Sequence, residues 1–159
     1  MSFKTFTTGL IGIVFGFFLA AILAYSYAPE MMIQEDVSQY NYQQTVDKLT
    51  LHAKEAGWKL PAVHDFQKTM QKHGYDVRPV SVFELCRVDY AAKILLDSSS
   101  RHVSSMMPCR IAVYENDQGQ TVISRMNTGL VAKLFNDNIR TVMAQATAES
   151  DAIVNQLIQ

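Results

Sequence analysis

The sequence predicts an α+β domain that follows one apolar helix. Residues Gly9 to Ala28 form an uncharged, almost wholly apolar run. After this run, segments with the two-residue periodicity of strands alternate with segments that have the 3.6-residue periodicity of helices. Two consecutive strand patterns near the C-terminus are joined by a polar turn, which is typical of a hairpin. Mixed strands and helices that end in a hairpin predict a sheet with helices packed on one face.

The apolar run predicts a membrane-spanning helix. At about 1.5 Å per residue it can cross the ~30 Å of hydrocarbon in a bilayer. A retained anchor and a cleaved signal peptide both fit such a run, and Ser26-Tyr27-Ala28 matches a small-x-small cleavage site. We favour the anchor because the apolar core is longer than the roughly 7–15 residues usual in signal peptides. Residues 1–30 are then a short cytoplasmic N-terminus and a transmembrane helix.

The charges that flank the run predict its orientation. Lys4 precedes the run, whereas Glu30, Glu35 and Asp36 follow it, with no Lys or Arg before Lys48. Basic residues stay on the cytoplasmic side of a membrane. We therefore expect a single-pass protein of the inner (cytoplasmic) membrane whose domain faces the periplasm.

Small residues recur every four positions within the run. They lie on one face of the helix and would let a second helix approach closely. The alternative is that glycine and alanine are simply common in such segments. Besides the lipid bilayer, the expected partner is a second copy of the chain or another membrane protein, which this helix would contact. The residues of this stripe are Gly12, Gly16, Ala20 and Ala24.

The rest of the chain has the size and charge of one compact domain. In the whole chain 14 Lys and Arg nearly balance 15 Asp and Glu, and no basic face stands out, so nucleic acid is not an expected partner. Residues 31–40 are predicted to be a linker that runs into the first strand, and residues 35–159 the α+β domain.

The first half of the domain shows a strand, a helix and a second strand. Residues Met32–Val37 alternate as a strand does. An amphipathic helix follows and ends at Gly57, with His52 and Thr45 on its solvated face. Residues Trp58–Val63 read as the second strand. The apolar stripe of the helix consists of Tyr42, Val46, Leu49, Ala53 and Ala56.

The second half continues this alternation. Asp65 is predicted to cap a short helix, and Val77–Val88 is the longest strand pattern. Asp89 is expected to cap the next helix. The hairpin pairs two strands, and one long helix closes the chain. The corresponding segments are Phe66–His73, Tyr90–Asp97, Cys109–Tyr114, Thr121–Met126 and Gly129–Leu157.

The main question about the chemistry of this chain concerns its two cysteines. Cys86 lies near the end of one predicted strand and Cys109 opens the next. They can be two small buried apolar residues, because free cysteine is often buried. They can also form a disulfide in an oxidising compartment, which needs Cα atoms within about 7 Å.

The third interpretation is a soft-metal or redox-active thiol site. His102, Met106 and Met107 lie within eight residues of Cys109, and Cys86 can converge on them. Thiolate, thioether and imidazole suit Cu(I) or haem iron rather than Mg²⁺ or Ca²⁺. The spacing matches no CxxC, CxxCH or HxxxH motif, so the absence of any cofactor is the simpler expectation and the metal stays unknown.

No pattern of catalytic residues is present. The sequence contains no GxSxG elbow, no Walker loop and no GxGxxG. Glu84, close to Cys86, is expected to pair with Arg87 or Arg110 across the sheet. No catalytic residue is assigned, and an enzyme is the less favoured class.

The segments FELCRVDYAAKILLDSS and MMPCRIAVYENDQGQTVISRMN resemble the bacterial family catalogued as domain of unknown function 302. The helix that ends in Ala56-Gly57-Trp58, and Asp65, also fit that family. The resemblance covers about residues 35–158. It implies a TBP-like α+β fold with a single antiparallel or mixed sheet, often dimeric, with no agreed activity and with Cys86 and Cys109 at characteristic positions.

This chain departs from the family pattern in two ways. The family often has Asn-Pro after the first cysteine, whereas Arg87-Val88 stands here. Its members are commonly soluble, so the anchor is an addition. The expected function is a membrane-anchored, non-enzymatic accessory domain that binds a ligand or partner, with a place as a subunit of a membrane complex among the expected roles. The alternative is a redox or soft-metal handling protein that uses the cysteine pair.

Overall fold

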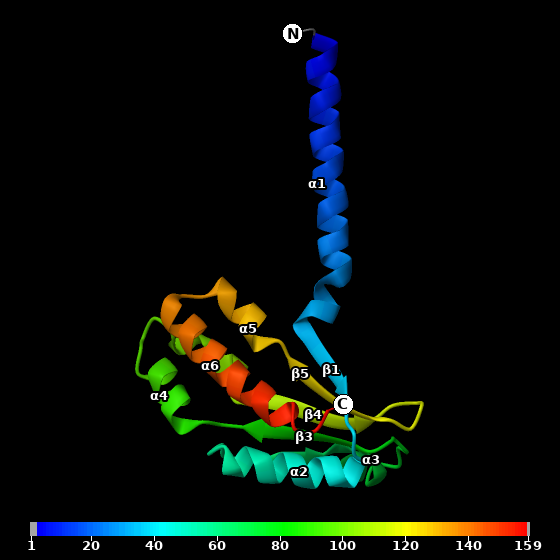
Figure 1. Ribbon diagram of the computed structural model, residues 1–159, viewed down its shortest axis with the longest axis vertical. Coiled ribbons are helices and arrows are strands. Elements are labelled where there is room, and N and C mark those ends of the chain that lie inside the picture. The colour runs from blue at the N-terminus through cyan, green and yellow to red at the C-terminus, as the bar shows by residue number, and fades with distance from the viewer. Residues whose placement is uncertain (1–2, 159) are drawn as a thin grey trace. The chain divides into compact units, whose positions relative to one another are not determined.

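The computed structural model describes residues 3–158, which form two compact units. The first unit ends at Met32 and contains the helix α1 (Phe3–Met32). The second begins at Ile33 and holds the sheet and the other helices (Figure 1). Helix α1 runs to Met32 and strand β1 starts at Ile33, so the range 31–40, predicted as a linker that runs into the first strand, contains β1.

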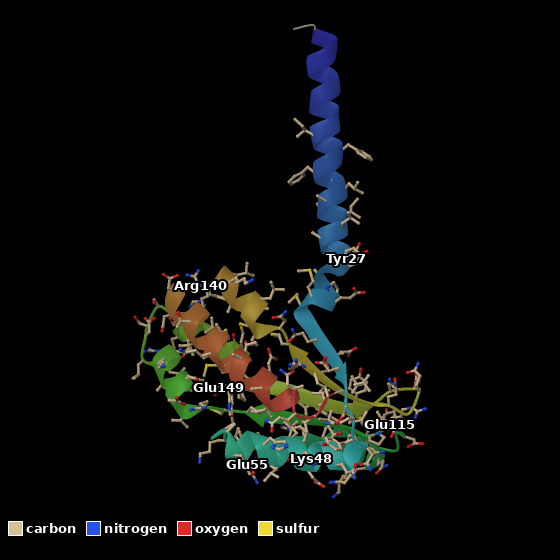
Figure 2. The ribbon with its side chains drawn as sticks, viewed as in Figure 1. Tyr27, Lys48, Glu55, Glu115, Arg140 and Glu149 are labelled. Atoms are coloured by element: carbon tan, nitrogen blue, oxygen red, sulfur yellow. The ribbon has the colours of Figure 1, made fainter. Side chains whose placement is uncertain are left out.

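The helix α1 has the length and composition of a membrane span. Its 30 residues measure about 45 Å along the axis at 1.5 Å per residue. The window Phe15–Met32 contains no buried residue, and Figure 2 shows its side chains extending from the helix on several sides. Signal sequences meet the same criteria of length and composition.

The domain contains one five-stranded sheet, and this confirms the α+β class. The strand order is β1-β5-β4-β3-β2, and every neighbouring pair is antiparallel. The predicted hairpin is present as β4 and β5. The strands are β1 (Ile33–Val37), β2 (Val63–Asp65), β3 (Val80–Leu85), β4 (Cys109–Glu115) and β5 (Thr121–Met126).

Helices α2 and α6 contribute to the main core together with alternate residues of the strands. Leu49 of α2 and Val154 of α6 belong to the same buried cluster as Phe83, Ile111 and Ile123. The alternation along β3 to β5 therefore places large apolar side chains against these helices. The helices are α2 (Tyr42–Glu55), α3 (Phe66–Gln71), α4 (Val88–Leu95), α5 (Thr128–Val131) and α6 (Asp137–Val154), with 3₁₀ turns η1 (Arg101–Met106) and η2 (Ala132–Leu134).

The second strand begins later than predicted. Within the predicted range Trp58–Val63, Lys59 makes an isolated bridge to Cys86, and ladder pairing starts only at Val63. Pro61 lies between the two and has no N–H to donate to a neighbouring strand. Proline thus separates the single bridge from β2.

Two helix boundaries differ from the prediction. Helix α4 starts at Val88 and its N-cap residue is Arg87, so Asp89 lies in the first turn rather than at the cap. The predicted helix Gly129–Leu157 is broken, because the Asn136 side chain accepts a hydrogen bond from the Ile139 N–H at 3.0 Å and starts α6 afresh. The predicted cap at Asp65 is confirmed, since its Oδ1 accepts the Lys68 N–H at 2.8 Å.

Thr45 is fully buried rather than on the solvated face of α2. Its hydroxyl lies 2.8 Å from that of Ser38 and donates to the Asn41 carbonyl at 2.9 Å. A threonine can be buried in this way because local and long-range partners satisfy its hydroxyl. His52 remains at the surface in contact with Glu55, as predicted for an ordinary surface histidine.

Candidate functional site

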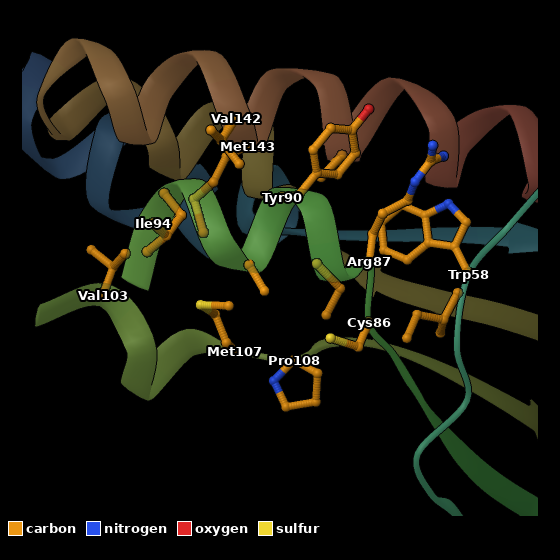
Figure 3. A pocket seen from close by; sticks show the side chains of 14 residues that line it. Trp58, Cys86, Arg87, Tyr90, Ile94, Val103, Met107, Pro108, Val142 and Met143 are labelled. Carbon is orange, nitrogen blue, oxygen red and sulfur yellow. The ribbon is translucent and has the colours of Figure 1, made fainter. Parts of the chain in front are cut away.

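Both cysteines line one small cavity in the domain. Leu85 at the end of β3 pairs with Cys109 at the start of β4, so the next residue, Cys86, lies beside Cys109. The bridge of Cys86 to Lys59, with N–O distances of 2.8 and 2.9 Å, fixes its backbone. The cavity has a volume of about 50 Å³ and is walled mainly by apolar side chains of β3, α4, η1 and α6 (Figure 3).

The two cysteines are free thiols in this structure, so they are not joined by the disulfide that was one of the three interpretations. Burial raises the pKa of the Cys109 thiol above its usual value, and the neighbouring Cys86 raises it further. A second negative charge close to a thiolate disfavours ionisation. Burial and the neighbouring Cys86 therefore both favour the neutral thiol form of Cys109.

Two methionines reach the same cavity. Met107 approaches from the segment before β4, and Met143 approaches from α6 (Figure 3). Met107 was among the predicted site residues, whereas Met143 was not. The sequence places Met143 on the apolar side of a helix, and a helical apolar stripe gives no sign that this residue lines a cavity with two cysteines distant in sequence.

Two predicted site residues lie elsewhere. His102 is exposed, with its ring centroid 5.9 Å from that of Phe135. Met106 packs against the second core cluster and lines a different, larger cavity, which Cys109 also lines. The predicted set is therefore divided: Cys86, Cys109 and Met107 line the smaller cavity, Met106 shares only the larger one with Cys109, and His102 lines neither.

An ionic cluster lies at one side of the cavity. Arg87 donates to Glu149 at 2.5 Å and to the Ala56 carbonyl at 3.2 Å. The Tyr90 hydroxyl donates to the other oxygen of Glu149 at 2.6 Å, and this hydrogen bond raises the pKa of Tyr90, followed in importance by burial. The expected pairing of Arg87 with Glu84 is not what the structure shows.

Glu84 instead pairs with Arg110 and His64. Its Oε1 lies 3.6 Å from Arg110 Nη2 and 3.1 Å from His64 Nε2. The Arg110 alternative was thus the right one of the two predicted for Glu84. This leaves Arg87 available to brace α4 against α6 beside the thiols.

The second cavity lies between the diverging ends of β4 and β5 and the helix α6. Its volume is about 400 Å³, and its wall includes polar groups of Thr147, Ser150 and Asp151. Arg125 also lines it but is engaged, because it donates to Asp36 at 2.6 Å and to Asp151 at 2.9 Å. Cys109, Met106 and Met126 also line this cavity, whereas Cys86, Met107 and Met143 do not.

A carboxylate network joins the segment that leads to Met107 with the start of α6. Asp97 accepts hydrogen bonds from the Ser100 hydroxyl at 2.5 Å, from the Ser99 N–H at 3.0 Å and from the Asn138 side chain at 3.1 Å. These bonds favour the ionised form and lower the pKa of Asp97 to about 2. The network ties together two of the elements that supply the sulfur atoms.

Asp97→Asn is expected to lower the thermal midpoint at pH 6 but to leave it unchanged near pH 2. The folded-state pKa lies below the ordinary value of 3.8, so the stabilisation is present above that value and is lost as the pH falls towards 2. Melting curves of both proteins between pH 2 and 6 measure this. Asp117→Asn, on an exposed turn, is the matched control and should stay close to wild type. A midpoint difference that does not depend on pH would contradict the role given to the Asp97 charge.

The described positions of the small-residue stripe leave it accessible. Ala20 and Ala24 are exposed, and a Cβ atom added at Gly12 or Gly16 would meet nothing within 4 Å. The stripe thus has room for a second helix along α1. Its pairing with another helix stays a prediction.

The fold and the cavity define the class of this protein as a small α+β domain with a five-stranded antiparallel sheet and a sulfur-lined cavity beneath its helices. A solved structure described as the crystal structure of the uncharacterised conserved protein DUF302 from Bacillus stearothermophilus has the same fold. The match has a TM-score of 0.71 at 20% identity and covers 80% of this chain and 98% of that one.

The family described as domain of unknown function DUF302 matches residues 33–157, and the chain belongs to it. The resemblance found in the two cysteine-containing segments is therefore confirmed. A comparison with curated proteins found no match. All four sulfur-bearing residues of the cavity lie within the matched range, and α1 lies before it.

Proposed function

We propose that this protein is a non-enzymatic binding domain that α1 anchors in the inner membrane, with the domain on the periplasmic side. The observation that carries the proposal is that the Phe15–Met32 window is apolar and wholly unburied. Meanwhile both core clusters are built from residues after Met32, among the residues that the structure describes. An apolar helix that contributes nothing to a core needs another apolar environment, and a bilayer supplies one.

The flanking charges and the stripe on α1 support the finer points of the proposal. Lys4 before the helix and the acidic residues after it favour an N-terminus in the cytoplasm. The stripe that begins at Gly12 and Gly16 would bring α1 against a second copy of itself or the helix of a larger membrane complex. The protein would then act as an accessory subunit that presents its domain outside the membrane.

Fractionation of cells that express the full chain tests the anchor. The chain should stay in membranes washed at alkaline pH, at the mass of the complete sequence. Phe18→Arg with Ile22→Arg should release most of it, because each charge at the centre of a span costs about 2.5–3.5 kcal/mol. Leu96→Arg is the matched control, since Leu96 is an exposed apolar residue of the domain. A soluble chain shortened to begin after Ala28 would show a signal peptide and contradict the anchor.

A second candidate function is soft-metal or redox chemistry at the cavity. The observation in its favour is that Cys86, Cys109 and Met107 converge there, joined by Met143. A volume of about 50 Å³ is far below the roughly 300–1,000 Å³ of sites for organic ligands and cofactors, so of the two expected groups copper fits and haem does not.

A further inference from the structure

We propose that the cavity is a Cu(I) site with two thiolate ligands, from Cys86 and Cys109, and two thioether ligands, from Met107 and Met143. The inference rests on the second candidate function and deepens it by naming the ion and the four ligands. It does not depend on the membrane anchor. The juxtaposition of four sulfur-bearing side chains from three parts of the fold around one small cavity is the observation that carries it.

The donor atoms select the metal. Of the fourteen lining residues, the ones with electron-pair donors suited to a metal are the two cysteines and the two methionines, apart from the hydroxyl of Tyr90, which is already engaged with Glu149. Thiolate and thioether are soft ligands that favour Cu(I), whereas Mg²⁺, Ca²⁺ and Mn²⁺ require oxygen. The sulfur donors of this cavity therefore favour Cu(I) over Mg²⁺, Ca²⁺ and Mn²⁺.

Zinc fits this cavity poorly. Structural zinc takes four ligands from cysteine, histidine and carboxylate side chains. Among residues 3–158, no group of three such side chains is placed to hold a metal ion. The two cysteines would leave zinc two ligands short, whereas a thioether can complete a Cu(I) site.

The size and wall of the cavity suit a bare ion. A volume of about 50 Å³ exceeds the ~10–15 Å³ that one water requires, but it leaves no room for an organic cofactor. Leu85, Ile94 and Val142 contribute apolar wall, so an ion bound there would have sulfur ligands set among apolar side chains.

The charge balance can be written for one ion. Binding of Cu(I) replaces the two thiol protons, which leave to solvent, and no electron is transferred. Two thiolates and one Cu(I) ion carry a net charge of −1. The Arg87 side chain also lines the cavity, and its hydrogen bonds to Ala56 and Glu149 hold the guanidinium at that side. The Arg87 charge is already paired with Glu149 and Asp89, so it offsets little of the charge of the site.

Competition with a chromophoric Cu(I) chelator, on the reduced full chain purified in detergent, tests the proposal. We expect one Cu(I) per chain. Loss of a second-shell residue usually weakens metal binding 10–100-fold, so Cys86→Ser and Cys109→Ser, which remove direct ligands, should weaken it by at least about a hundredfold. Met107→Leu and Met143→Leu should each weaken it about tenfold. They conserve volume, and Trp58 fluorescence checks that these variants stay folded.

Two matched controls come from the predicted residues that do not line the smaller cavity. Met106→Leu, one position from Met107, and His102→Ala should leave the affinity within about twofold of wild type. X-ray absorption of the copper-loaded chain should show sulfur ligands without nitrogen. Copper retained by the Cys86→Ser, Cys109→Ser double variant would overturn the site. A wild-type chain that takes no Cu(I) from the chelator would overturn it as well. An equal loss in Met106→Leu and Met107→Leu would overturn the ligand assignment.

These measurements separate the two proposals. A chain that binds no copper but stays in washed membranes removes the Cu(I) site and leaves the anchored binding domain intact. A chain that binds copper but is released from membranes removes the anchor and leaves the Cu(I) site intact.

Discussion

Phe83→Ala is expected to lower the free energy of unfolding by about 4 kcal/mol. Phe83 is fully buried in the middle of β3, where its register partners are Val63 on one side and Ile111 on the other. Truncation of a buried phenylalanine to alanine costs about 3–5 kcal/mol, since transfer energy is lost and a cavity remains. Here the neighbours are strands of one sheet, which cannot collapse freely into the gap.

Urea unfolding followed by fluorescence measures this effect, because the single tryptophan, Trp58, is buried in the same cluster as Phe83. Leu96→Ala is the matched control. Leu96 is 83% exposed, so its truncation should cost less than about 0.5 kcal/mol. A loss below about 1 kcal/mol for Phe83→Ala would mean that the two helices do not pack on this face of the sheet as described.

Local patterns were enough to predict the class of the fold. The alternation along Cys109–Tyr114 and Thr121–Met126 identified the hairpin, which the structure contains as β4 and β5. The carboxylate of Asp65 identified the start of α3. It accepts a hydrogen bond from the N–H of Lys68, three residues later. Both features depend on residues close together in sequence, where geometry follows directly from the chain.

The predictions that failed depended on long-range or competing contacts. Pro61 interrupts the second strand because its missing N–H cannot join a ladder, although the apolar pattern continues through it. Asn136 starts a new helix inside a continuous apolar pattern. Thr45 is buried because Ser38, seven residues earlier, supplies a hydroxyl partner. Periodicity reports which side chains are apolar and says little about which polar groups will find partners.

The site was predictable only in part for a similar reason. Cys86 directly follows β3, Cys109 opens β4 and Met107 lies two residues before it, so their proximity follows from the pairing of β3 with β4. Met143 comes from α6, and only the packing of α6 on the sheet brings it to the cavity. His102 was included for its chemistry and its spacing, but the 3₁₀ turn η1 that contains it leaves its side chain at the surface.

The separation of the two units has a functional consequence. The family match covers the domain with its cavity and does not include α1. The cavity therefore lies in the part of the chain that the family model matches, whereas α1 lies outside it. A Cu(I) site on an anchored domain would keep the ion beside the membrane rather than let it diffuse with a soluble carrier.

Arg125→Met is expected to lower the free energy of unfolding by about 2–3 kcal/mol. The Arg125 side chain is 9% exposed and binds Asp36 of β1 at 2.6 Å and Asp151 of α6 at 2.9 Å. Removal of one partner from a buried ion pair costs about 3–5 kcal/mol, because the opposite charge is left without compensation. The two carboxylates are each about one-third exposed, so solvent screens part of that cost.

The comparison variant is Arg140→Met, which removes an exposed pair with Asp137 and should cost less than about 0.5 kcal/mol. A second substitution identifies the cause of the stability loss in Arg125→Met. If the cost comes from two carboxylates left facing each other, Asp151→Asn in the Arg125→Met background should restore part of the stability, even though it removes another charged group. No recovery in the double variant would assign the loss to packing of the arginine side chain. Recovery would show that Arg125 joins β1, β5 and α6 mainly through charge.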